Sequence, residues 1–269
     1  MLALGGAIYD EITYKSDKVQ NDKQLAFLQN TTLSNIGDKR STREAYASLG
    51  KGNWANLQGA LDEVKAIGRI VNGTSVVTGS DVTEYNIKNM SKSGELEKYK
   101  VLHFATHGLT VPDFPELSSI VLSQFKEEHE NQDGYLRMGE IAELRIKADF
   151  VNLSACETGL GKIYGGEGVV GLTHSFLLAG ANAISASLWS VEDSSTAKFM
   201  VGVYQLVEEK GLTYAKAINE MKRAFIRGQI SVDHFDPLRG LEIGAATNSQ
   251  PNKLSHPFYW APFVYYGKN

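Results

Sequence analysis

Short apolar runs bounded by polar or glycine-containing turns recur along most of the chain. Runs of this kind indicate buried strands. The predicted strands lie at 2–9, 75–78, 101–108, 151–155 and 182–188, and an aromatic-rich strand closes the chain at 258–266. Two further apolar arms, 118–123 and 135–137, flank a strongly polar tip and indicate an inserted β-hairpin.

Between the strands, apolar side chains recur at helical spacing. The predicted helices lie at 54–71, 82–90, 139–144, 169–179, 192–209 and 213–227. We expect Asp81 to cap the second helix at its N-terminus, and Gly180 to end the fourth. Strands that alternate with helices predict an α/β fold, a mostly parallel sheet with helices on both faces.

A polar stretch at about 10–52 interrupts this alternation after the first strand. A loop of this length is uncommon inside a compact domain, so we interpret it as a surface insertion. No internal repeat divides the remainder, and the length suits one large domain. We therefore treat 1–269 as a single domain.

Composition narrows the class of partners and the compartment. The net charge of −4 gives no electrostatic case for nucleic acid. No stretch approaches the roughly 18 apolar residues of a membrane helix, and the first residues lack the basic region of a signal peptide. The single cysteine cannot form an internal disulfide, which favours a reducing, cytoplasmic setting.

That cysteine, Cys156, follows a predicted strand and is followed by Glu-Thr-Gly. A lone cysteine is most often a small core residue. This one stands at a strand end, as does His107 after the strand at 101–108. Ligands of open α/β sheets bind outside the carboxyl ends of parallel strands, so the two side chains could form one site. A nucleophilic cysteine needs such a base nearby.

Two histidines compete for the role of base. His103 lies deeper in the apolar run, which favours a structural role beneath the site, and His107 precedes Gly108, where the backbone can approach a ligand. The amides of Gly108 and Cys156 could together point at a developing oxyanion. A metal site made of Cys156 and the two histidines has only three ligands and no recognised spacing, so we expect no metal and no cofactor.

Six short motifs follow one another along the chain. They are His-Phe-Ala-Thr-His-Gly at 103–108, Leu-Ser-Ala-Cys-Glu-Thr-Gly at 153–159, Gly-Glu-Gly-Val-Val-Gly-Leu at 166–172, Ala-Gly-Ala at 179–181, Ser-Leu-Trp-Ser-Val-Glu-Asp at 187–193 and His-Pro-Phe-Tyr-Trp-Ala-Pro-Phe at 256–263. In this order they resemble the CHAT domain, a caspase-like cysteine peptidase domain akin to separase that usually follows tetratricopeptide repeats. Each motif alone is modest, whereas six in order over nearly the whole chain are specific.

The resemblance implies a caspase-like sheet and a His107/Cys156 dyad with an oxyanion hole at Gly108 and Cys156. In separases an aspartate after Leu-Trp lines the pocket for an arginine, and Asp193 occupies that place here. We therefore expect substrate contacts from Asp193, Trp189 and Glu157, and cleavage after a basic residue. The alternative for Asp193 is a helix N-cap, and the two roles are compatible.

The chain departs from the family in its insertion at about 10–52, in its acidic hairpin tip and in the absence of a repeat array. We expect a cysteine endopeptidase that cleaves a partner protein within a prokaryotic defence or signalling system. Its regulator would be a tetratricopeptide-repeat or effector-complex partner. Two rivals stay open: a catalytically silent caspase-like interaction module, and another thiol-dependent acyl hydrolase.

Overall fold

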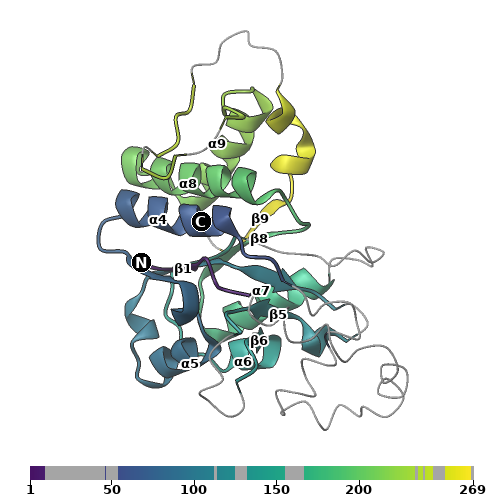
Figure 1. The fold of residues 1–269 in the computed structure, drawn as a ribbon. Coiled ribbons are helices and arrows are strands. Elements are labelled where there is room, and N and C mark those ends of the chain that lie inside the picture. Colours follow the sequence, from purple (N-terminus) through teal and green to yellow (C-terminus); the bar gives the residue numbers. More distant parts are fainter. Residues whose placement is uncertain are drawn as a thin grey trace, which may run out of the picture.

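The structure is a computed structural model, and its fold is drawn in Figure 1. It describes residues 1–9, 46, 54–111, 114–124, 132–154, 167–233, 236–238, 240–244 and 252–267, with backbone only for 167–170. Most of the predicted insertion at 10–52 and most of the hairpin tip lie outside these residues.

A six-stranded sheet runs through the centre of the fold in the order β2-β1-β3-β7-β8-β9. Its strands are β1 (Leu2–Gly5), β2 (Ser75–Thr78), β3 (Val101–Ala105), β7 (Phe150–Leu153), β8 (Ala183–Ser187) and β9 (Phe263–Gly267). All neighbouring pairs are parallel except β8 and β9. The α/β prediction with a mostly parallel sheet is thereby confirmed.

Helices cover both faces of this sheet (Figure 1). The helix α4 (Gln58–Ile70) and the packed pair α8 (Asp193–Lys210) and α9 (Tyr214–Ile226) lie on one face; α5 (Glu84–Lys92), α6 (Met138–Ala142) and α7 (Glu167–Ala179) lie on the other. Successive side chains of a strand point to opposite faces. Accordingly, His103 contacts Tyr204 in α8, whereas Phe104 packs on Phe176 in α7.

A small antiparallel sheet, β4-β5-β6, sits beside the main one. Its strands are β4 (His107–Leu109), β5 (Ser119–Val121) and β6 (Tyr135–Arg137). The predicted hairpin is therefore confirmed, and it gains a third strand. The single strand predicted at 101–108 was wrong, because the chain bends at Thr106 and passes from the large sheet into the small one.

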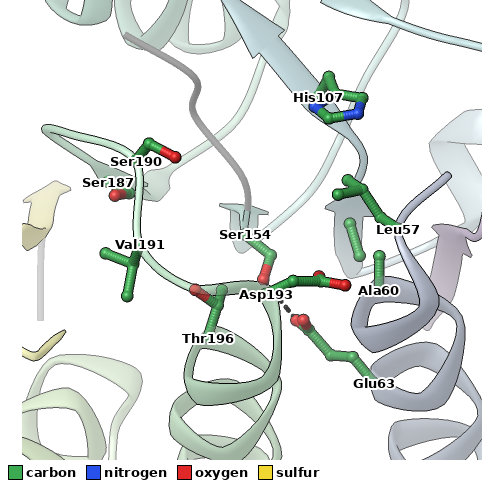
Figure 2. A pocket seen from close by; sticks show the side chains of 11 residues that line it. Leu57, Ala60, Glu63, His107, Ser154, Ser187, Ser190, Val191, Asp193 and Thr196 are labelled. Atoms are coloured by element: carbon green, nitrogen blue, oxygen red, sulfur yellow. Dashed lines mark hydrogen bonds between the residues drawn. The ribbon is translucent and has the colours of Figure 1, made fainter. Parts of the chain in front are cut away.

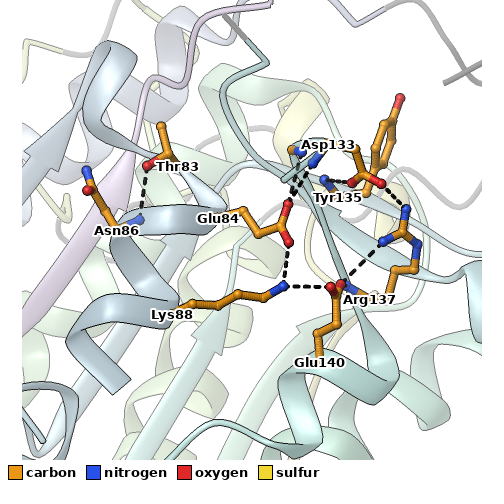
Figure 3. A network of polar contacts seen from close by, with 9 residues as sticks. Thr83, Glu84, Asn86, Lys88, Asp133, Tyr135, Arg137 and Glu140 are labelled. Carbon is orange, nitrogen blue, oxygen red and sulfur yellow. Dashed lines mark hydrogen bonds and ion pairs between the residues drawn. The ribbon is translucent and has the colours of Figure 1, made fainter. Parts of the chain in front are cut away.

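Polar contacts anchor the small sheet to α5 and α6 (Figure 3). The carboxylate of Glu84 accepts hydrogen bonds from the backbone N–H groups of Asp133 and Gly134, at 3.0 and 3.1 Å. Lys88 bridges Glu84 and Glu140, at 2.5 and 2.6 Å. These contacts fix the start of β6, whose register with β5 and β4 leads directly to His107.

Several predicted element ends shift in the structure. The helix expected at 82–90 begins at Glu84, and the side chain of Thr83, rather than Asp81, caps it. Asp81 ends a 3₁₀ turn, Gly79–Asp81. The closing strand begins only at Phe263, after the 3₁₀ turns Lys253–Ser255 and Pro257–Tyr259.

Two further 3₁₀ turns, Leu96–Lys98 and Pro115–Leu117, complete the regular elements of the described ranges. Within those ranges, no helix combines the length and the apolar character needed to cross a membrane.

Candidate functional site

His107 is the first residue of β4 and lies at the junction of the two sheets. Its side chain is buried, with 5% of the residue exposed. The ring packs between two aromatic rings, with centroids 5.0 Å from Tyr9 and 4.9 Å from Trp54. Its Nε2 lies 2.7 Å from the carbonyl oxygen of Ala55. The ring orientation is therefore set by three residues from segments distant in the sequence.

The contact with Ala55 also selects a tautomer of His107. A carbonyl oxygen only accepts hydrogen bonds, so Nε2 must carry the hydrogen. In the neutral ring the other nitrogen, Nδ1, then has the lone pair that can take up a proton. His107 can thus act as a base through Nδ1 while its position is held through Nε2.

The rings of Tyr9 and Trp54 form a clamp around His107, and hydrogen bonds hold both of these residues in place. The indole N–H of Trp54 donates to the hydroxyl of Tyr135 at 3.1 Å. The hydroxyl of Tyr9 donates to the carbonyl of Val121 at 2.9 Å. Val121 lies opposite His107 in β5, and Tyr135 lies opposite Val121 in β6. The small sheet therefore orders the clamp as well as the histidine.

A cleft opens beside His107 at the carboxyl ends of β3, β7 and β8 (Figure 2). Its cavity volume is about 60 Å³, and it is partly open to solvent. Its lining includes two carboxylates and four hydroxyls and comprises Leu57, Ala60, Glu63, Ala105, His107, Ser154, Ser187, Ser190, Val191, Asp193 and Thr196. The location agrees with the rule that ligands bind at the carboxyl edge of a parallel sheet.

Asp193 stands at the first position of α8, and its carboxylate points across the cleft to α4 (Figure 2). It accepts a hydrogen bond from the backbone N–H of Gly59 at 2.5 Å and another from that of Ala60. The N-cap position of α8 is Glu192, whose side chain makes no capping bond. The N-cap alternative for Asp193 was therefore wrong in one respect, because Asp193 caps α4 rather than its own helix.

Burial raises the pKa of Asp193 to about 6. The hydrogen bond from Gly59 favours the charged form and opposes this rise, whereas the nearby carboxylate of Glu63 adds to it. Asp193 is consequently ionised at neutral pH but poorly solvated. A buried carboxylate of this kind gains from a cationic partner entering the cleft.

A chain of buried polar groups runs beneath the cleft. The Oε1 atom of Glu63 accepts a hydrogen bond from Ser154 Oγ at 2.5 Å and lies 2.9 Å from His103 Nε2, though the latter pair is outside hydrogen-bonding geometry. His103 Nδ1 lies 3.1 Å from the hydroxyl of Tyr204 and 3.0 Å from Asn152 Nδ2. His103 is fully buried, as its predicted structural role requires.

The other predicted site residues are placed unequally. Cys156 and Glu157 lie outside the described residues, so the roles assigned to them stay predictions. Gly108 follows His107 in β4 and lies opposite Ile120, and its oxyanion role stays a prediction too. Trp189 follows β8, and its indole N–H donates to the carbonyl of Phe258 at 3.1 Å. Trp189 does not line the cleft itself, but the next residue in the sequence, Ser190, does.

The alternative to catalysis for Cys156, His103 and His107 is a metal site. Across the part of the chain that the structure describes, no three His, Cys, Asp or Glu side chains gather closely enough to hold a metal ion. Cys156 is outside that part.

Sequence reasoning missed several contributors to the site. Glu63 falls on an ordinary amphipathic helix, where a charged residue would normally face solvent. Tyr9 and Trp54 flank the long insertion, so their meeting at His107 depends on tertiary structure. A signal for Glu63 did exist: it shares a helix face with the buried Ala60, Ala66 and Ile67.

Comparison with protein families supplies an independent result. A family model described as CHAT domain matches residues 10–268 of the chain. This match covers nearly the whole chain and confirms the resemblance indicated by the six motifs. Comparison with curated proteins gave no match.

Proposed function

The chain belongs to the CHAT domain family, a caspase-like and peptidase-related family, and from that premise we propose that it is a cysteine endopeptidase with a His107/Cys156 dyad. The observation that carries the proposal is that His107 and Asp193 line one cleft at the carboxyl edge of the sheet. Ser154, two positions before Cys156 in the sequence, lines the same cleft. The proposed base, the proposed partner of a cation and the last described residue before Cys156 therefore line one cleft.

The proposed reaction passes through a thioester. His107 Nδ1 takes the proton of the Cys156 thiol, and the thiolate attacks the carbonyl carbon of the scissile peptide bond. The amides of Gly108 and Cys156 stabilise the oxyanion. His107 then gives its proton to the leaving amine as the C–N bond breaks. Water hydrolyses the thioester and restores the thiol.

Asp193 would select the residue before the cut. Its carboxylate is the charged group of the cleft that accepts backbone hydrogen bonds without a cationic partner among the residues described. A guanidinium or ammonium group entering the cleft would supply that partner. We therefore propose cleavage after a basic residue, with Trp189 and Glu157 contacting the substrate nearby.

The protein substrate would belong to a prokaryotic defence or signalling system in the cytoplasm. The family's usual association with tetratricopeptide repeats supports a repeat-containing or effector-complex regulator. Nothing in the charge of the chain favours a nucleic acid as a direct ligand.

The proposal is tested by profiling cleavage of a proteome-derived peptide library with the wild-type chain, Cys156→Ala and His107→Ala. We expect cuts after Arg or Lys with the wild type and none with either variant. Persistent cleavage by either variant would overturn the dyad.

A substrate-independent assay distinguishes the proposed enzyme from a silent interaction module. A peptidyl acyloxymethyl ketone ending in arginine should label Cys156 rapidly in the wild type and at least about 10²-fold more slowly in His107→Ala. Equal, slow labelling of both proteins would identify the interaction module. Rapid labelling with equal use of small thioester substrates would identify a general acyl hydrolase.

A further inference from the structure

The carboxylate of Glu63 is buried at the floor of the cleft, and the residue is 1% exposed. A buried carboxylate is costly unless nearby groups compensate its charge. Here Ser154 donates to Oε1 at 2.5 Å, and His103 Nε2 lies 2.9 Å from the same atom. Figure 2 shows the carboxylate directed at Ser154 beneath Asp193. The same oxygen of Glu63 thus contacts His103 in β3 and Ser154 directly after β7.

Those two strands lead to the two members of the proposed dyad. Ser154 directly follows β7, and Cys156 comes two positions later in the sequence. His103 lies in β3, from which the chain passes through Thr106 to His107. The backbone N–H of Ser154 also bonds to the carbonyl of Phe104 in β3, at 2.9 Å. Glu63 therefore adds a side-chain link between β3 and the end of β7, next to this backbone hydrogen bond.

The helix that carries Glu63, together with the segment just before it, also contacts other residues of the site. The segment just before α4 supplies the ring of Trp54 and the carbonyl of Ala55, which hold His107. The first turn of α4 holds Asp193 through Gly59. Glu63 lies one turn beyond Gly59. Helix α4 and the segment just before it therefore contact His107, Asp193, His103 in β3 and Ser154 after β7.

His103 is oriented so that its Nε2 atom faces the carboxylate of Glu63. Burial raises the pKa of Tyr204 well above its ordinary value, so the phenol keeps its hydrogen and donates it to His103 Nδ1. Asn152 Nδ2 also donates to Nδ1. Because Nδ1 accepts, Nε2 carries the hydrogen of the neutral ring, and the nearest acceptor to it is Glu63 Oε1.

We propose that Glu63 is a positioning residue, whose Oε1 ties the end of β7 to β3 so that Cys156 is presented to His107. The inference rests on the proposed function and names a further residue for it. A role in binding substrate is a different proposal, and it is disfavoured because Oε1 is engaged and the side chain is buried.

Cys156 is the only cysteine in the chain, so alkylation by iodoacetamide, followed by intact-protein mass spectrometry, reports on it alone. In the wild type, pairing with His107 should keep the alkylation rate high well below the ordinary thiol pKa of about 8.5. In Glu63→Leu, which removes both contacts, we expect the midpoint of the pH profile to rise by about one unit or more. The rate at pH 6.5 should fall roughly tenfold or more.

Glu63→Gln separates position from charge. The amide oxygen of glutamine can accept the same hydrogen bond from Ser154 and can keep the same contact with His103 Nε2. We therefore expect its alkylation profile to stay close to that of the wild type, within about threefold in rate. A shift as large as that of Glu63→Leu would mean that the charge of Glu63 acts on the dyad, and would overturn a positioning role.

Ile67→Ala is the matched control, because Ile67 is buried one turn further along the same helix. It should lower the melting temperature and leave the pH profile unchanged. If Glu63→Leu does not fold, Ser154→Ala removes one of the two ties with a smaller change, and should give the same shift to a lesser degree.

Failure of the two proposals can be told apart. An ordinary thiol profile in the wild-type chain would overturn the dyad, and with it the need for Glu63 to position it. An activated wild-type profile that Glu63→Leu and Ser154→Ala leave unchanged would overturn the role of Glu63 alone.

Discussion

The carboxylate of Asp193, at the start of α8, accepts a hydrogen bond from the backbone N–H of Gly59, at the start of α4, at a distance of 2.5 Å. Two helix N-termini therefore converge on one carboxylate. Helix N-termini favour negative charge, whereas burial disfavours it. The balance leaves a carboxylate whose pKa is raised to about 6 in the same cleft as the proposed catalytic histidine.

The first prediction concerns the pH dependence of substrate selection. Above a pH of about 6 Asp193 is charged and should favour a basic residue before the cut; as the pH falls through 6 the carboxyl is protonated and the preference should fade. Asp193→Asn keeps an oxygen for the N–H of Gly59 but removes the charge. We expect the ratio of kcat/KM for arginine over glutamine peptides to fall by about 10²-fold at pH 7.5.

Glu192→Gln is the control for this prediction. Glu192 precedes Asp193 but is exposed and pairs with Lys253 at 3.0 Å. Its substitution should leave both the selectivity and its pH dependence unchanged. An arginine preference that persists in Asp193→Asn would show that another group recognises the basic residue.

The same carboxyl also affects stability. Its folded pKa is raised above the ordinary value of about 4, so the folded state binds the proton more tightly than the unfolded state. This contribution to stability is fully present below about pH 4 and is lost as the pH rises through about 6. Asp193→Asn should remove this component from the pH dependence of unfolding measured in urea.

The second prediction uses the close approach of Gly59 to Asp193. A Cβ atom at position 59 would lie 2.6 Å from the carboxyl carbon of Asp193 and 2.7 Å from Oδ2. Gly59→Ala must therefore displace the carboxylate while leaving it in the chain. We expect a loss of arginine preference of about tenfold, with less effect on cleavage of a neutral peptide.

The double variant Gly59→Ala/Asp193→Asn tests the mechanism of that loss. If both changes act through one carboxylate, their effects on selectivity should not add, and the double variant should resemble Asp193→Asn. Gly68→Ala provides the comparison within α4, because a Cβ there meets only the side chain of Val76. Additive effects would mean that Gly59→Ala disturbs the cleft by another route.

Much of the main sheet could be predicted because its inner strands β1, β3, β7 and β8 are buried on both faces and read as apolar runs. The bend at Thr106 could not, since the residues on both sides of it are equally buried and no glycine or proline marks it. Consequently the assignment of His107 to a separate small sheet required the pairing with β5. His107, the predicted site histidine, therefore begins a strand of the small sheet instead of ending a strand of the large one.

The acidic lining of the cleft was only half predictable. Asp193 follows a short motif near the end of a strand, whereas Glu63 lies about 130 residues earlier on a helix whose pattern looks ordinary. Their proximity results from the crossing of α4 and α8 over the sheet. Tertiary packing of this kind leaves no local signal in the sequence.

The third prediction concerns the contacts that anchor the small sheet (Figure 3). Burial raises the pKa of Glu84 to about 7, while the pairing of Lys88 with Glu84 and Glu140 raises the pKa of the lysine. Lys88→Met leaves the carboxylate of Glu84 buried without its cation. We expect the free energy of unfolding to fall by about 2 kcal/mol at pH 8, as measured by urea denaturation.

The loss should depend on pH with a definite sign. The pKa of Glu84 is raised in the folded state, so folding favours the protonated carboxyl. The resulting contribution to stability is fully present below about pH 4 and is lost as the pH rises through about 7. At pH 5 the unpaired carboxyl of Lys88→Met is neutral, and the penalty should shrink. Lys92→Met, the same change at an exposed position of α5, should cost less than about 0.5 kcal/mol at either pH. A penalty for Lys88→Met that grows on acidification would contradict this account.

The fourth prediction tests the clamp around His107. Trp54→Phe loses the hydrogen bond to Tyr135 but keeps an aromatic ring, whereas Trp54→Leu loses both. If the ring contact orients the imidazole, kcat should fall about twofold to fivefold in Trp54→Phe and at least about tenfold in Trp54→Leu, with KM little changed. Trp260→Leu is the matched control, because the indole N–H of Trp260 also donates one hydrogen bond, to the backbone carbonyl of Ser255 at 3.0 Å. Since Trp260 lies outside the cleft lining, its loss should lower the melting temperature without lowering kcat. Equal kcat losses in the two leucine variants would indicate a general loss of folded protein rather than a displaced His107.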